Sequence, residues 1–171
     1  MASLMEELID TLDKENQEYE KLLDLSKRKS SVIAARNIAE LEKITDEEQI
    51  VVSDISRLDN KRAEVTKDIA NVINKDVESL KLSNLVDLMA RQPKEQKMLA
   101  EVHDKLKSTV SQVRSLNENN QKLIEESLEM VQFDMNLLRS LRGAPQTANY
   151  GRNAISYGAE LGAVKGFDAK Q

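Results

Sequence analysis

Residues 41–72 read LEKITDEEQIVVSDISRLDNKRAEVTKDIANV, and this stretch decides the class of fold. One set of positions recurs at alternating spacings of three and four residues, which is the heptad pattern of a helix that packs against other helices. The set consists of Leu41, Ile44, Glu48, Val51, Ile55, Leu58, Arg62, Val65, Ile69 and Val72. We therefore predict one long amphipathic helix here, with this seam facing its neighbours.

Glycine distribution divides the chain on either side of this stretch. All five glycines lie at or after Gly143, and Pro93 is the only proline before that point. Because glycine costs a helix interior about 1 kcal/mol relative to alanine, a long glycine-free region favours long helices. We predict a helical bundle domain over residues 1–142 and a flexible tail containing glycine and aromatic residues over 143–171.

Capping signals give the expected ends of the first two helices. Ser3 with Glu6 forms a capping box at the start of the first helix. Its seam is Met5, Leu8, Leu12, Glu15, Tyr19, Leu22, Ser26, Lys29 and Ile33. The second helix is expected to begin near Asn37, with Thr45 and Glu48 as an alternative start.

Two further helices are expected after the second one. Ser83 is expected to cap a short bridging helix over residues 84–91, and Pro93 suits the first position of a long helix that ends near Arg142. Gly143 is expected to end it in a left-handed conformation. The predicted fold is all-α: an elongated antiparallel three-helix bundle or coiled coil, with a short bridging helix and a flexible C-terminal tail. The same seams also allow a homodimer.

Composition excludes several classes of partner. The net charge of −5 is opposite to the basic face that nucleic acids or anionic membranes require, so we expect no nucleic-acid binding. No apolar run approaches the roughly 20 residues of a membrane span, so no membrane insertion is expected. The first residues are acidic where a signal peptide would be basic, which predicts a cytoplasmic protein.

The sequence offers little for catalysis or for a cofactor. Cysteine is absent and His103 is the only histidine, so thiolate chemistry and a two-histidine metal site are both excluded. We expect His103 to face solvent and the many carboxylates to be solvated charges on helix faces. We predict no enzyme activity, no metal and no cofactor.

Two features exceed what a passive spacer requires. Asn120 occupies a seam position of the long helix, where a buried amide can fix the register of packed helices. Three of the five aromatic residues, Tyr150, Tyr157 and Phe167, lie in the glycine-containing tail. Spaced apolar side chains in such a tail suit a segment that becomes ordered on binding, although an inert disordered end is the alternative.

Together these features resemble the FlgN family of flagellar secretion chaperones. The resemblance lies in the helix from Leu4 to Leu25, the turn NIAELE (37–42), the block LNENN (116–120) and the tail ending GFDAK (166–170). Leu123, Leu128 and Phe133 follow the asparagine block in the same way. The resemblance covers essentially the whole chain.

The resemblance implies a role in the export of proteins that form the flagellar hook-filament junction. It implies cytoplasmic binding of hook-associated proteins one and three, protection of their amphipathic terminal helices, and delivery to the type III export gate. No cofactor is implied. A helical groove would serve as a temporary partner for those terminal helices.

For contact with a client we select apolar residues of the late long helix and of the tail. They are Leu123, Leu128, Met135, Leu138, Tyr150, Ile155, Tyr157, Leu161, Val164 and Phe167. An aromatic residue of the tail, Tyr150 for preference, is expected to dock at the export gate as an alternative to contacting the client. The competing function is a structural scaffold that self-associates through its seams.

Overall fold

The computed structural model describes residues 2–77, 80–89 and 92–143, and every element in these ranges is an α-helix. The helices are α1 (Ala2–Ala34), α2 (Ile38–Ile73), α3 (Leu82–Leu88) and α4 (Pro93–Gly143). The all-α class predicted from the heptad pattern is confirmed.

The chain divides into two compact units, Met1–Phe133 and Asp134–Gln171. Unit 1 holds α1, α2, α3 and α4 as far as Phe133, and unit 2 begins with residues 134–143 of α4. The predicted tail lies almost entirely outside the described residues. The division into a bundle and a tail at residue 142 therefore stays a prediction.

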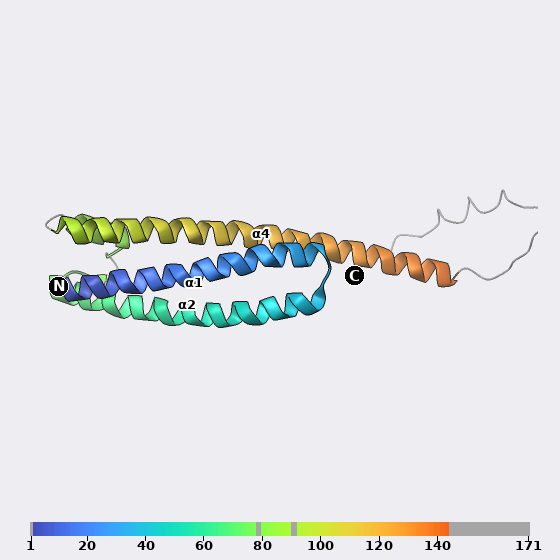
Figure 1. Ribbon diagram of the computed structural model, residues 1–171, viewed down its shortest axis with the longest axis horizontal. Helices are drawn as coiled ribbons and strands as arrows, with labels where there is room; N and C mark the ends of the chain where they lie inside the picture. The colour runs from blue at the N-terminus through green and yellow to red at the C-terminus, as the bar shows by residue number, and fades with distance from the viewer. Residues whose placement is uncertain (1, 78–79, 90–91, 144–171) are drawn as a thin grey trace, which may run out of the picture. The chain divides into compact units, whose positions relative to one another are not determined.

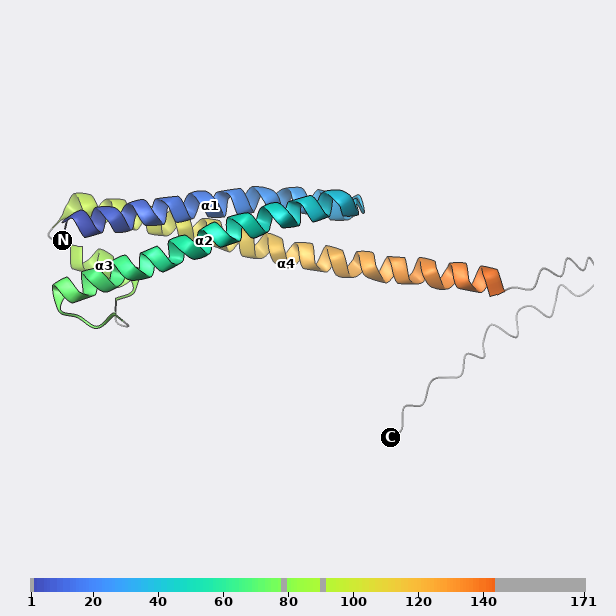
Figure 2. The ribbon, with the colours of Figure 1, turned by 90° about the horizontal axis from the view of Figure 1, so that it is seen from below.

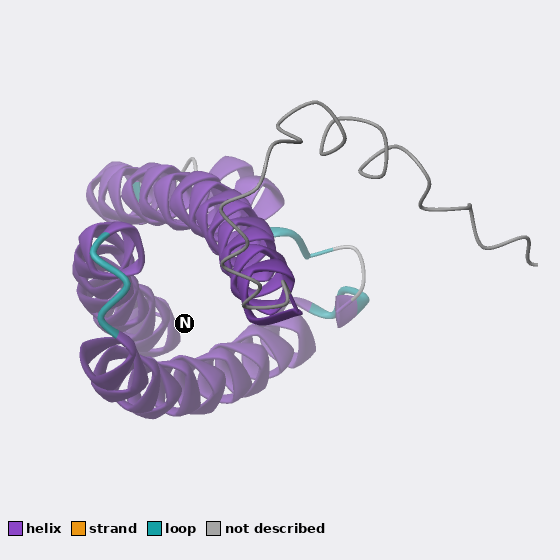
Figure 3. Cartoon of the chain, turned by 90° about the vertical axis from the view of Figure 1, so that its right-hand side faces the viewer, coloured by secondary structure: helices purple, strands orange, loops and turns teal. Residues whose placement is uncertain are grey.

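In unit 1, α1 and α2 run antiparallel and α4 runs parallel to α1 (Figures 1 and 2). Ion pairs join α1 to α2 along their length, from Glu7–Lys61 at 2.5 Å to Lys29–Glu48 at 2.7 Å. Seen along the helices, α2 and α4 lie on different sides of α1 (Figure 3). Helix α3 lies near the start of α4 (Figure 2). With 7 residues it is too short to carry a long heptad seam.

Two apolar clusters form the core of unit 1. One combines α1, α2, α3 and the first part of α4, and includes Leu8, Ile69, Leu85 and Leu99, each at most 2% exposed. The other joins the second half of α1 to the first half of α2 and to Val113 of α4. The burial of Ile44, Val51, Ile55, Val65 and Ile69 confirms the seam predicted for α2. Val72 is 56% exposed, so the seam ends one turn earlier than predicted.

Helix ends in this glycine-free region use other residues in the left-handed conformation. Arg36 and Asn74 both have a φ of 54°. After α1, the amide of Asn37 donates to the carbonyl of Val32 and that of Arg36 to Ile33, which is the Schellman pattern. Gly143 was expected to adopt this conformation, but its φ is not positive, so that prediction is wrong.

Two of the four helices begin where the sequence predicted. The side chain of Asn37 accepts a hydrogen bond from the amide of Glu40 at 3.2 Å, and α4 begins at Pro93, as predicted. α1 begins at Ala2, one residue before the expected cap Ser3. α3 begins at Leu82 with Lys81 as its N-cap, so Ser83 lies inside the helix and does not cap it. Packing of Leu82 and Leu85 against the core, and not a side-chain cap, sets this start.

Candidate functional site

The C-terminal part of α4 exposes its large apolar side chains. Within unit 1 these are Leu128 (63% exposed), Met130, Val131 and Phe133 (66% exposed). Leu128 and Val131 are separated by three residues, as are Met130 and Phe133, so each pair shares one face of the helix. Exposed apolar groups that gather on one short segment are typical of a protein-binding surface.

The described residues of unit 2 continue this composition. Met135, Leu137, Leu138 and Leu141 are all exposed, with Leu141 at 65%. Within unit 2, Met135 and Leu138 are three residues apart and Leu137 and Leu141 are four apart, so each pair shares one face of the helix. We call these eight exposed residues of α4 the apolar end of α4. They are Leu128, Met130, Val131, Phe133, Met135, Leu137, Leu138 and Leu141.

The end of α1 explains why the unit 1 part of this surface is uncovered. Ser30 of α1 lies opposite Asn120 of α4, and the hydrogen bond between their side chains measures 2.5 Å. α1 ends at Ala34, a single turn later, so the matching level on α4 is about residue 124 at the same helical rise. At the turn beyond it, the Arg36 guanidinium contacts the Met130 sulfur. Residues 128–133 therefore lie beyond the last part of the α4 seam that α1 can cover.

A layer of small polar groups fixes this register between α1 and α4. Asn120 is 3% exposed, and its Nδ2 donates to the carbonyl of Ser26 at 2.9 Å. The Ser26 hydroxyl donates to Asn117 Oδ1 at 3.1 Å. These bonds are satisfied only when the two helices sit at one axial offset, because a slip would leave buried polar groups unpaired. The predicted register role of Asn120 is consistent with these bonds.

A second polar layer lies between the two apolar clusters. Thr109 Oγ1 of α4 donates to Asn16 Oδ1 of α1 at 2.9 Å. Nearby, the carboxylate of Glu15 is 4% exposed, and Arg62 Nε lies 3.5 Å from its Oε2 without a hydrogen bond to that atom. Burial raises the pKa of Glu15 above its ordinary value, the positive charge of Arg62 opposes this, and Asp59 adds to it. Unit 1 thus contains an acid whose burial disfavours its charged form.

Of the residues selected from the sequence for client contact, three lie in the apolar end. Leu128, Met135 and Leu138 are exposed at 63%, 44% and 57%. Leu123 is half-buried, one turn before the apolar end. The other six selected residues lie outside the described part of the chain. They are Tyr150, Ile155, Tyr157, Leu161, Val164 and Phe167.

Sequence reasoning omitted five members of the apolar end. Met130, Leu137 and Leu141 continue the alternating spacing of three and four residues that runs from Asn120 through positions 123, 127 and 134. They therefore occupy seam positions, and a seam predicts burial until the length of the neighbouring helices is known. Val131 and Phe133 lie beside that seam. The available signal was the difference in length between the long last helix and the two earlier ones, which leaves part of the last seam without a neighbour.

Chemical sites are not apparent in the parts of the chain that the structure describes. Over residues 2–77, 80–89 and 92–143, no three His, Asp or Glu side chains converge as ligands for a metal ion. His103 is half-buried, with a side chain 29% exposed beside Asp104, and not fully solvent-facing as expected. Among the same residues no helix is apolar and long enough for a membrane span.

Comparison with known families gave one finding. A family model described as FlgN protein matches residues 1–155, which includes all four helices. Searches of curated proteins and of solved structures gave no match.

Proposed function

The chain belongs to the FlgN family, the flagellar export chaperones, and from this premise we propose that it binds hook-associated proteins one and three in the cytoplasm. On this proposal it delivers them to the flagellar type III export gate. The apolar end of α4 is the observation that carries the proposal. Its side chains are uncovered in the free chain, and they follow the spacing that an amphipathic helix recognises.

The rest of the fold supports this role by holding α4 in place. We take α1, α2 and α4 as a three-helix bundle with α3 as the bridging helix. The bonds of Asn120 with Ser26 and Ser30 hold α4 at one offset along α1. This offset keeps Leu128 and Phe133 beyond the reach of α1, so the client surface stays open.

Substituting the apolar end tests the client site. We expect Leu128→Ala, Met135→Ala and Leu138→Ala, combined in one variant, to weaken binding of a purified hook-associated protein by about 100-fold, at about 1 kcal/mol for each truncation. The measurement is a dissociation constant from calorimetry. Because all three side chains are exposed in the free chain, its thermal stability should hardly change.

A matched control uses exposed aliphatic residues elsewhere. Ile38, Ile50 and Val72 of α2 are 70%, 66% and 56% exposed, so their combined change to Ala removes similar apolar area. This control should bind the client like the natural chain. Equal losses in the two triple variants, or no loss in either, would show that the apolar end does not recognise the client.

The tail residues selected from the sequence form a separate part of the proposal. We propose that Tyr150, Ile155, Tyr157, Leu161, Val164 and Phe167 contact the client or, through Tyr150, the export gate. Tyr150→Ala and Leu161→Ala are then expected to reduce capture of one of these two partners in a pull-down. Gln146→Ala is the matched tail control. If neither Tyr150→Ala nor Leu161→Ala reduces either capture, the tail has no such role.

The exposed apolar end also fits the alternative of a self-associating scaffold. Light scattering of the full chain, alone and with a hook-associated protein, separates the two functions. A chaperone should give a complex with the client, and the Leu128, Met135 and Leu138 variant should lose that complex. A scaffold should form a stable dimer whose mass the client does not change.

A further inference from the structure

A groove between α2, α3 and α4 in unit 1 is lined by cations over an apolar floor. Two hollows of about 560 and 370 Å³ share Arg62, Leu82 and His103, so they form one continuous groove that is open to solvent. Leu82 and Val110 contribute half-buried side chains to its floor and also pack against the core. We call this surface the basic groove.

Charge distinguishes the basic groove from the rest of the chain. Its cations are Arg62, Lys81, Lys107 and Arg114, and among the described lining residues there is no Asp or Glu. The whole chain has a net charge of −5, so this arrangement opposes the average composition. Arg62 has Glu15 and Asp59 as partners. Within the described ranges, Lys81, Lys107 and Arg114 form no ion pair, and their charges remain available to a partner.

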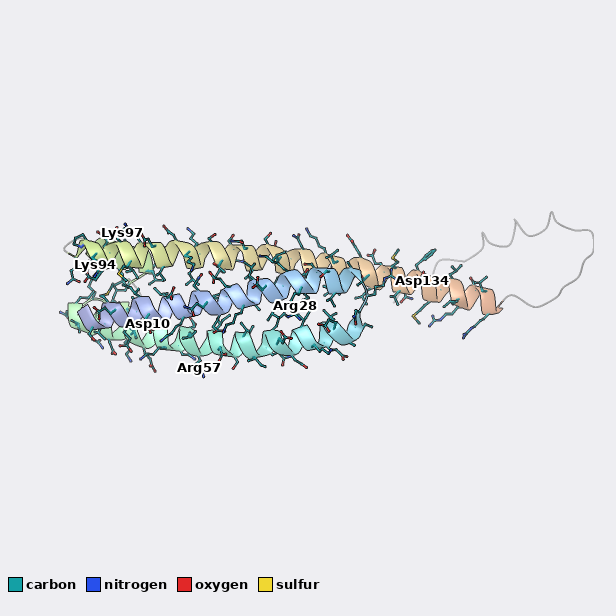
Figure 4. The ribbon with its side chains drawn as sticks, in the orientation of Figure 1. Asp10, Arg28, Arg57, Lys94, Lys97 and Asp134 are labelled. Atoms are coloured by element: carbon teal, nitrogen blue, oxygen red, sulfur yellow. The ribbon has the colours of Figure 1, made fainter. Side chains whose placement is uncertain are left out.

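The hollow on the α1 side of α4 has the opposite charge. It is lined by Glu6, Asp10, Asp13 and Glu95, with Lys94 as its cation. Figure 4 labels Asp10 on α1 and Lys94 near the start of α4. Both hollows have apolar side chains in the floor, so the charge of the lining residues distinguishes them. A ligand selected by charge would discriminate between the two.

We propose that the basic groove docks an amphipathic helix of a partner protein, with carboxylates on both sides of its apolar stripe. The stripe would cover Leu82 and Val110, and the carboxylates would pair with Lys107 and Arg114. Charge complementarity steers such a partner and fixes its orientation. The apolar floor favours a helix over a nucleic acid, whose phosphates would leave Leu82 and Val110 uncovered.

The chain's own tail suits the groove less well. Its side chains after Gly143 include three cations, Arg152, Lys165 and Lys170, against Glu160 and Asp168. Such a segment does not supply the excess of carboxylates that the groove would attract. The proposal does not rest on the client site, because every groove residue precedes the apolar end of α4.

A pair of designed peptides tests the proposal with the full chain. The first is a helix of about 18 residues, or five turns, with a leucine stripe flanked by glutamates, and the second has lysine at each glutamate position. Fluorescence anisotropy should show binding of the acidic peptide and at least about tenfold weaker binding of the basic one. A single-stranded RNA oligonucleotide is the third probe and should not compete.

Charge reversal locates the binding. Lys107→Glu with Arg114→Glu should weaken binding of the acidic peptide by about tenfold, and both side chains are exposed, so the fold should persist. The matched control is Lys97→Glu with Lys122→Glu, the same change of charge at exposed α4 positions outside the groove. Figure 4 shows Lys97 on the side of α4 away from α1.

Three binding results would overturn the proposal. They are equal binding of the acidic and basic peptides, equal losses in the groove and control variants, and displacement of the peptide by the RNA. Methyl NMR shifts at Leu82 and Val110 on adding the acidic peptide are also expected. Shifts confined to Leu128 and Leu138 would place the peptide on the client surface instead. The triple variant at Leu128, Met135 and Leu138 should bind the acidic peptide normally, which keeps the two proposals separable.

Discussion

Two regions of α4, residues 99–120 and 128–141, continue one heptad seam but differ in their neighbours. From Leu99 to Asn120 the seam is covered, with Leu99 fully buried and Val113 5% exposed. From Leu128 to Leu141 every leucine, methionine, valine and phenylalanine is exposed. A heptad seam is therefore buried where another helix lies against it, and in the described residues it is exposed where none does.

The boundary between these regions depends on how α1 ends. The Schellman hydrogen bonds of Arg36 and Asn37 stop α1 and return the chain into α2. The bonds of Asn120 then fix which residues of α4 lie level with that end. The polar layer between α1 and α4 thus determines how much apolar surface in residues 128–133 is left uncovered.

Truncating a leucine in each region should give the largest contrast. Leu99→Ala removes a fully buried side chain from the core cluster of α1, α2, α3 and α4, and should lower the free energy of unfolding by about 2–5 kcal/mol. Leu141→Ala should change it by less than about 0.5 kcal/mol, because that side chain is 65% exposed. Urea denaturation of both variants measures this. Similar losses in the two would mean that the end of α4 is covered in solution.

The polar layer should give an intermediate effect. Asn120→Ala leaves the Ser26 carbonyl and the Ser30 hydroxyl without this partner, and should destabilise the fold by about 1–3 kcal/mol. Asn119→Ala, at the exposed neighbouring position, is the control and should be nearly neutral. Denaturation gives the stability. An Asn120→Ala protein as stable as the control would show that these bonds do not hold the register.

The smallest effect should be a dependence of the free energy of unfolding on pH, which arises from the buried carboxylate of Glu15 in unit 1. Because burial raises the pKa of Glu15 above its ordinary value of 4.5, the folded chain binds this proton more tightly than the unfolded chain does. The free energy of unfolding contributed by Glu15 then falls as pH rises from 4.5 through the folded-state pKa. Glu15→Gln should remove this contribution, so the variant should gain stability relative to the natural chain over that range.

The difference between the two proteins is the quantity to follow. Urea denaturation of both at a series of pH values from 4.5 upward measures this difference. Other acids titrate alike in both chains, and their effects cancel in the difference. A difference that does not change with pH, or one that favours the natural chain as pH rises, would contradict the assignment of a raised pKa to Glu15.

Local patterns account for most of what was predicted correctly. The seams of α1 and α2, the cap at Asn37 and the start of α4 at Pro93 depend on helix periodicity and on hydrogen bonds between near neighbours in the chain. Ser83 failed as a cap because packing of Leu82 and Leu85 extended α3 by two residues in the N-terminal direction. His103 failed as a solvent-facing residue because α2 and α4 form a groove beside it.

The sequence by itself determined an all-helical chain and the apolar positions of each helix, because these follow from spacing along one polypeptide. Only the tertiary structure decided which of those positions are covered. Met130 and Val113 belong to the same seam, yet one is exposed and the other is core, since coverage depends on where α1 ends and on the offset that Asn120 sets. Likewise, Lys107 and Arg114 of α4 line one groove with Arg62 of α2, and only the tertiary structure places these residues together.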